Sequence, residues 1–205
     1  MDYTAIPSPE VVQKTAQALT ANNFEPIIVS TKKEALAKIK ELIPVGASVM
    51  NGASTTLEQI GYIEYLKSGQ HGWDNLHEKI LAEKDPAKQG LLRRQSVASD
   101  FYLGSAHALS QTGELVFGSN TGSQLPGLAF TAPNLILVVG THKITPTLQD
   151  ALARLNGYVT EREDERLMKA HGAHTIHAKT LILHKENPNL GRKVRIILVN
   201  EVLGF

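Results

Sequence analysis

The sequence contains no cysteine among its 205 residues. Disulfides, thiolate metal sites, cysteine-ligated iron–sulfur clusters and a cysteine nucleophile are therefore excluded. Long apolar runs are also missing, and none approaches the ~20 residues that a membrane-spanning helix needs. The N-terminal stretch MDYTAIPSPEVV lacks the basic and apolar segments of a secretory signal peptide. We therefore expect a cytoplasmic protein without a membrane partner.

An excess of charge of one sign is absent too. Lysine and arginine number 21 against 20 aspartates and glutamates, which gives a formal net charge of +1. Aromatic residues make up 5% of the chain and do not interleave with a basic stripe, so we expect no nucleic-acid partner. The length suffices for one large domain with its own core. We predict a single domain over residues 1–205, which includes the helical and strand segment 1–45.

The apolar run Leu135–Val139 lies between Asn134 and Gly140 and indicates a strand buried on both faces, as in a parallel sheet. Helices with capping signals alternate with other short apolar runs along the chain. This alternation predicts an α/β fold with a mostly parallel central sheet flanked by helices. The strands expected in one sheet are 47–50, 101–109, 115–117, 135–139, 179–184 and 194–199.

The turn residues Asn187–Gly191 separate the last two of these runs. They predict a C-terminal strand pair, formed either as a hairpin or as adjacent strands at the sheet edge. A further short strand is expected at Pro26–Ser30, between two helices of the N-terminal segment.

Three polar clusters each follow an apolar run, namely Gln111–Glu114, Gly118–Ser123 and Gly140–Lys143. Ligands of open α/β sheets bind beyond the carboxyl ends of the strands, so all three clusters are candidates for one site. Lys143 follows the predicted central strand, where a cation can meet an anionic ligand, although a lone lysine after a strand is also common without such a role. Glu114 is a candidate general base or nucleophile, or it orients a hydroxyl group. The alternative for Glu114 is an exposed acid in a turn.

A fourth polar loop, Asn51–Thr56, connects a predicted strand to the start of a predicted helix. Free backbone N–H groups and the helix dipole favour an anion at such a loop. The alternative is an ordinary strand–helix loop with a good cap, since Thr55 and Glu58 have the spacing of a capping box.

Because loops at the carboxyl ends of parallel strands share one edge, we predict that the four polar loops converge in one cleft. The residues expected to meet there are Asn51, Glu114, Asn120 and Lys143. The full set of candidate ligand-binding residues is Asn51, Gly52, Ser54, Thr55, Thr56, Glu114, Ser119, Asn120, Thr121, Gly122 and Lys143.

The three histidines His171, His174 and His177 are spaced three residues apart. Successive members of such a series drift around a helix axis, so they share no face. We therefore expect a polar connection that enters a strand, with no metal site and no resident cofactor.

Four sequence blocks together carry a resemblance to a known family. They are MNGASTTLEQIGY (50–62), LGSAHALSQTGELVFGSNTGSQLPG (103–127), LILVVGTHKI (135–144) and VRIILVNEVLGF (194–205). In these blocks the chain resembles the LUD-domain family of the lactate utilization protein C type. The resemblance covers nearly the whole chain from about Pro44 onward.

The resemblance implies a fold similar to that of sugar-phosphate isomerases and CoA-transferases. In that wider group a small-residue loop binds phosphate, and Asn51–Thr56 lies where that loop would be. An acid after a glycine turn and a lysine after a later strand also serve those enzymes, and Glu114 and Lys143 look like their counterparts. Likeness of fold alone is a weak basis for assigning an activity.

The resemblance leads to three functional hypotheses. The first is a protein of lactate or related organic-acid utilization that binds a small anionic metabolite or a nucleotide-like ligand. The second is an isomerase, transferase or hydrolase that acts on a phosphorylated or CoA-linked substrate. The third is an accessory subunit of an iron–sulfur oxidoreductase complex. Whether the protein is an enzyme, whether it forms a homo-oligomer, and whether iron–sulfur proteins are its partners are left open.

Overall fold

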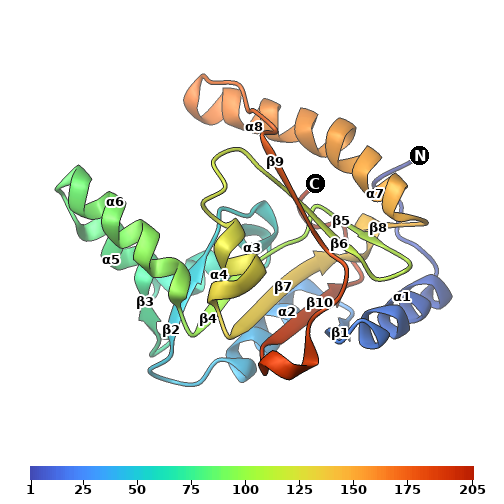
Figure 1. The fold of residues 1–205 in the computed structure, drawn as a ribbon, viewed down its shortest axis with the longest axis horizontal. Helices are drawn as coiled ribbons and strands as arrows, with labels where there is room; N and C mark the ends of the chain where they lie inside the picture. Colours follow the sequence, from blue (N-terminus) through green and yellow to red (C-terminus); the bar gives the residue numbers. More distant parts are fainter.

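The computed structural model describes all 205 residues and has a six-stranded parallel sheet at its centre. Figure 1 shows the strands side by side, with helices on both faces of the sheet. The strand order is β1-β10-β7-β4-β2-β3, and every pairing in this sheet is parallel. The strands are β1 (Glu25–Val29), β2 (Ser48–Asn51), β3 (Asp74–Asn75), β4 (Phe101–Gly104), β7 (Asn134–Gly140) and β10 (Lys193–Val199). The predicted α/β class with a mostly parallel central sheet is confirmed.

Strand β7 lies in the middle of this sheet, between β10 and β4. All five residues of Leu135–Val139 are fully buried. Side chains alternate between the two faces of a strand, so the run contributes to two separate cores. Leu135, Leu137 and Val139 belong to one core, and Ile136 and Val138 belong to the other. The unbroken apolar run was therefore a correct indicator of a central strand.

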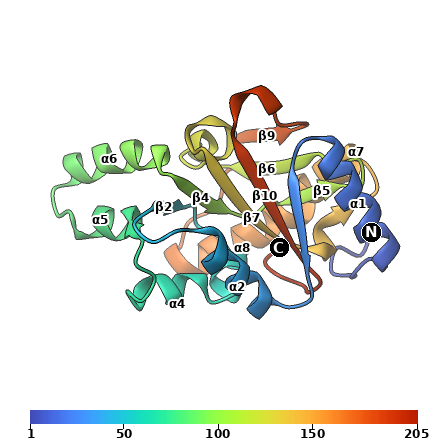
Figure 2. The ribbon, with the colours of Figure 1, turned by 90° about the horizontal axis from the view of Figure 1, so that it is seen from below.

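Eight α-helices and a second, smaller sheet surround the central sheet. The helices are α1 (Pro9–Ala21), α2 (Lys32–Leu42), α3 (Thr55–Gln59), α4 (Tyr62–Lys67), α5 (Leu76–Ala82), α6 (Pro86–Gln95), α7 (Leu148–Arg154) and α8 (Thr160–His171). Buried residues of α2, α3 and α4 share one core with Ile136 and Val138. Buried residues of α1 share the other core with the small sheet. Figure 2 shows α5 and α6 extending beyond one end of the molecule, with α1 near the opposite end.

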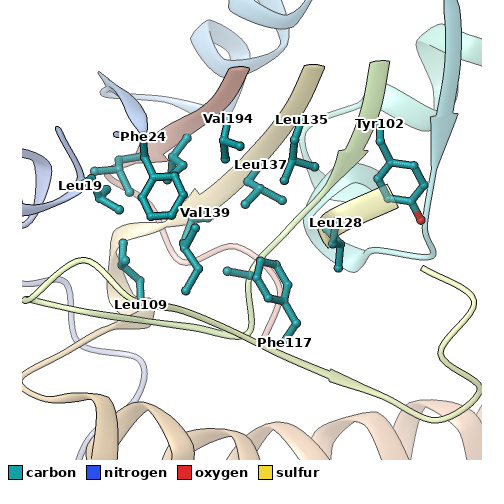
Figure 3. Packing of buried hydrophobic residues seen from close by; sticks show 14 of the residues in the cluster. Leu19, Phe24, Tyr102, Leu109, Phe117, Leu128, Leu135, Leu137, Val139 and Val194 are labelled. Carbon is teal, nitrogen blue, oxygen red and sulfur yellow. The ribbon is translucent and has the colours of Figure 1, made fainter. Parts of the chain in front are cut away.

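The small sheet has the strand order β8-β5-β6-β9. Its strands are β5 (Ala108–Ser110), β6 (Leu115–Ser119), β8 (Ile144–Thr145) and β9 (Lys179–Leu183). In Figure 3, Leu109 and Phe117 of this sheet lie opposite Leu137 and Val139 of β7. On its other side the small sheet packs against Ala151, Leu155 and Val159, which come from α7 and the π-helical turn Leu155–Val159 that leads to α8.

The predicted single sheet is thus divided in two. The expected strand 101–109 is interrupted at Ser105–His107, so that β4 belongs to the large sheet and β5 to the small one. A second short segment, Thr141–Lys143, also carries the chain from the large sheet to the small one, between β7 and β8. The apolar pattern did not reveal either crossing, because residues are buried equally whether a run continues in one sheet or changes to another.

Both strands predicted near the C-terminus form, but the prediction that they are adjacent was wrong. Strand β9 pairs with β6 at the edge of the small sheet, whereas β10 lies between β1 and β7. The physical reason is that the two strands differ in burial. Ile196–Val199 is fully buried on both faces, and such a run must lie inside a sheet, whereas β9 is only partly buried.

None of the helices combines the length with the apolar character that crossing a lipid bilayer would demand.

Candidate ligand-binding site

A cavity of about 390 Å³ opens at the carboxyl ends of β2, β4 and β7. Its size falls in the range of cavities that bind small molecules. The walls come from the loops after these strands, from the loop after β6, and from helices α5, α6 and α8. The candidate residues that line it are Asn51, Gly52, Ser54, Thr55, Thr56, Ser119, Asn120, Thr121 and Lys143. Segments distant in the sequence therefore meet at one edge of the sheet, as the topology requires.

The loop after β2 lies directly against the loop after β6. The side-chain amide of Gln124 donates to the carbonyl of Gly118 at 3.2 Å. A Cβ atom on Gly52 would lie 2.8 Å from Oε1 of the same glutamine, so a larger residue would displace the Gln124 side chain. Gln124 thus joins the two loops, a role that sequence reasoning had not assigned to it.

The cap of helix α3 differs from the predicted one. Ser54 is the N-cap, and its hydroxyl accepts from the Leu57 N–H at 3.3 Å. The capping-box reading of Thr55 and Glu58 was therefore wrong, because the helix begins at Thr55 and the capping side chain is the preceding serine. Thr56 lies in the first turn of this helix, where its hydroxyl donates to the Leu203 carbonyl at 3.3 Å and accepts from Lys143.

Lys143 is the most unusual side chain in the cavity wall. It is 2% exposed, and its ammonium donates to Thr56 Oγ1 at 3.2 Å, to Ser105 Oγ at 3.2 Å and to the Ala106 carbonyl at 3.3 Å. None of the salt bridges of the protein involves it. Burial, with a smaller effect from Arg154, lowers the pKa of Lys143 from 10.5 to about 7. A lysine buried without a carboxylate is costly for a fold and marks a functional candidate.

His107 is a second residue of the site, and sequence reasoning missed it. Its Nδ1 atom accepts from the Gly118 N–H at 3.0 Å, which places the ring proton of the neutral form on Nε2. Burial, together with the nearby charge of Lys143, lowers the pKa of His107 to about 3. The ring is thus a neutral hydrogen-bond donor in the cavity wall. The available signal was a histidine inside the largely apolar run 101–109.

The charges around the cavity favour an anionic ligand. Arg166 is neutralised by Glu163, because both carboxylate oxygens accept from its guanidinium at 2.7 Å. Arg93 lines the cavity and forms no salt bridge, as is also true of Lys143. Glu58 is the remaining acid of the wall. When Lys143 is protonated, the wall therefore holds two cations without a direct carboxylate partner against one free acid.

Glu114 does not lie in the cavity, so the predicted convergence fails at this residue. It occupies the turn between β5 and β6, where Ser110 and Thr112 donate to its carboxylate, the latter at 2.6 Å. His107 and Gly118 stand at the opposite end of the same hairpin, against the cavity. Ligands bind beyond the carboxyl ends of the parallel strands in one sheet. Glu114 instead lies in a turn that connects two antiparallel strands of the other sheet.

Gly122, another candidate, is also absent from the cavity wall. It has a φ of +84° and its N–H donates to Ser119 Oγ at 3.0 Å, so it forms the turn of this loop without facing the cavity.

The three histidines at 171, 174 and 177 do not form a cluster. His174 pairs with Asp164 at 2.9 Å, whereas His177 lines the cavity beside the loop at Gly118.

Comparison with known proteins supports the fold and the family. The family model of the LUD domain matches residues 12–199, which extends the resemblance seen in the sequence toward the N-terminus. Among solved structures, a DUF162 family protein from Deinococcus radiodurans is similar over 95% of this chain and 100% of that chain. The TM-score is 0.57 and the identity is 14%, so this likeness concerns the fold alone. No curated protein matches the sequence.

Proposed function

Because this chain belongs to the LUD-domain family, we propose that it binds a small organic anion in the cavity around Lys143. The ligand is lactate or a related short 2-hydroxy or 2-oxo acid, and the protein serves the utilization of such acids. The observation that carries the proposal is Lys143 itself, a buried amine in a cavity wall without a carboxylate partner.

The environment of Lys143 supports an anion more than a neutral ligand. A buried cation that lacks a counter-ion is stabilised when an anion enters, because charge pairing offsets the loss of hydration. The hydroxyl groups of Ser105 and Thr56 lie at 3.2 Å from the amine and supply further polar contacts. Arg93 adds a second positive charge to the wall. A short carboxylate fits the charge, and the cavity of about 390 Å³ is large enough to admit it.

Binding of an anion should depend on pH in a defined direction. Lys143 has a pKa of about 7, so close to half of the molecules carry the ammonium at neutral pH. A bound carboxylate favours the charged form and raises this pKa, and binding is therefore coupled to proton uptake. Affinity should be constant well below pH 7 and should fall as the pH rises above it.

The proposal is tested by titration calorimetry with L-lactate, D-lactate, pyruvate and glycolate, beside a sugar phosphate, CoA and a nucleotide. We expect saturable binding of at least one short acid, weakened by ~1–3 kcal/mol in Lys143→Met, the usual loss for a hydrogen bond to a charged group. Glu114→Gln is the matched control, because it also removes a charge but lies outside the cavity, and it should bind as the parent protein does.

Two results would contradict the proposal. One is the absence of binding by every short acid, which would favour the alternative of an accessory subunit that acts through partner proteins. The other is equal affinity in the parent protein and Lys143→Met, which would show that the acid binds elsewhere. A thermal-shift measurement with the same compounds gives an independent reading, since a ligand of the folded state raises the Tm.

A further inference from the structure

We propose that Lys143 forms an imine with the carbonyl carbon of a 2-oxo acid bound in the cavity. This inference rests on the proposed function and adds a covalent step to it. The geometry that supports it is a buried lysine amine held in the cavity wall by three oxygen atoms, none of which is a carboxylate oxygen.

The three oxygen atoms fix the position of the amine without holding its proton strongly. Thr56 Oγ1, Ser105 Oγ and the Ala106 carbonyl are all uncharged acceptors at 3.2–3.3 Å. A carboxylate in their place would stabilise the ammonium and suppress nucleophilic attack by the nitrogen. Lysines that react with carbonyl compounds are typically desolvated or near another cation, and both conditions hold here.

Burial and a neighbouring cation both favour the neutral amine of Lys143. Burial is the main cause that lowers the pKa of Lys143 to about 7, and the Arg154 guanidinium adds to it. Arg154 is itself fully buried, with its guanidinium carbon 5.5 Å from the Tyr3 ring centroid and 5.1 Å from that of Tyr158. The nearby rings of His107 and His142 each have a pKa of about 3, lowered by burial, so both are neutral at neutral pH and add no charge beside the amine.

His107 supplies the second group that the reaction needs. It directly follows Ala106, whose carbonyl contacts the amine, and both residues line the cavity. Its Nε2–H is a neutral donor, which is able to polarise a carbonyl group without drawing the acid's carboxylate into a salt bridge. A 2-oxo acid suits this site for two reasons. Its carbonyl group can react with the amine beside His107, and its carboxylate is attracted by the positive charges of the cavity wall.

The step balances without an oxidant or a reductant. The lone pair of the Lys143 nitrogen forms a bond to the carbonyl carbon, while the carbonyl π electrons move to oxygen, which takes up a proton. The resulting carbinolamine loses that oxygen as water, and the two hydrogens of the amine leave overall with it. The products are a carbon–nitrogen double bond and one molecule of water.

The test is reductive trapping with sodium borohydride in the presence of pyruvate. Borohydride transfers hydride to the imine carbon and leaves a stable secondary amine, which mass spectrometry detects as one added pyruvate-derived group on the intact chain. Peptide mapping should place this group on Lys143. At saturating pyruvate, trapping at a fixed short time should increase with pH and level off well below pH 10.5, because Lys143 has a lowered pKa, whereas trapping on an ordinary lysine would continue to increase toward 10.5.

Two variants and one ligand complete the design. Lys143→Arg keeps a positive charge but has no reactive amine, and it should bind pyruvate without being trapped; Lys143→Met should also escape trapping, which covers a failure of the arginine variant to fold. Lys169→Arg, on the exposed surface of α8, is the matched control and should trap as the parent protein does. Lactate has no carbonyl carbon and should not be trapped itself, but it should compete with pyruvate.

The outcomes separate the two proposals. Saturable pyruvate binding without a borohydride-stable adduct would overturn the imine and leave the binding function intact. An adduct spread over several surface lysines, unaffected by Lys143→Met, would overturn it too. Absence of both binding and trapping would overturn the proposed function together with the imine.

Discussion

Lys143→Met should be more stable than the parent protein at about pH 6, and this advantage should shrink by about 3 kcal/mol as the pH is raised to about 9. The parent protein holds Lys143 with a pKa of about 7, against the ordinary value of 10.5 in the unfolded chain. Between these two values the unfolded chain binds more protons than the folded one. The free energy of unfolding of the parent therefore increases with pH in this window.

Methionine has a similar length and no titrating group, so the variant lacks this increase. Its own cost is the loss of hydrogen bonds to Thr56, Ser105 and Ala106, which lowers the stability of the variant at every pH. Urea unfolding at a series of pH values measures the difference directly. Lys169→Met, at an exposed position, is the control and should show no such pH dependence relative to the parent. A constant difference between Lys143→Met and the parent from pH 6 to 9 would show that the amine is not perturbed.

Gly140→Ala should destabilise the protein by about 3 kcal/mol, the upper end of the usual cost of overpacking a buried position. Gly140 ends β7, just before the segment that carries Lys143. A Cβ atom there would lie 2.7 Å from the backbone oxygen of Glu201 and 2.7 Å from Nδ1 of His142. Backbone and a buried ring must therefore move together to admit one methyl group.

Gly157→Ala provides the matched control for that substitution. Gly157 lies in the helical turn between α7 and α8, has no positive φ, and a Cβ atom added to it would meet no other atom within 4 Å. Alanine should therefore stabilise the protein by ~0.5–1 kcal/mol, since glycine loses more backbone freedom on folding. Chemical denaturation of both variants measures the contrast. Equal stabilities would mean that the backbone at Gly140 yields more easily than its contacts indicate.

The sequence predicted those parts of the fold that local patterns determine. Leu135–Val139 had to be a central strand, because five consecutive apolar residues satisfy burial on both faces. The division into two sheets was not predictable from patterns, since a crossing such as Ser105–His107 changes partners without changing the apolar character of the run. The position of β10 beside β1 likewise depends on contacts between residues that lie far apart in the chain.

The candidate site was predictable to the extent that it follows the edge of the parallel sheet. Asn51, Asn120 and Lys143 meet at the cavity because each follows a strand or loop directed toward that edge. Glu114 did not, because the antiparallel turn that contains it points away from the cavity. His107 was missed because its role depends on the Gly118 N–H, eleven residues later, which fixes the protonation of its ring.

The two chain crossings between the sheets have a consequence for how like charges are held together. Where the backbone leaves one sheet and enters the next, it passes beyond the regular pairing of strands, and its carbonyl groups become available to side chains. The Ala106 carbonyl accepts from Lys143, and the neighbouring His107 carbonyl accepts from Arg154. Two buried cations are thus anchored to adjacent peptide groups of one crossing. If this strand continued without interruption, neither anchor would exist, and the part of the lowered pKa of Lys143 that comes from Arg154 would be lost.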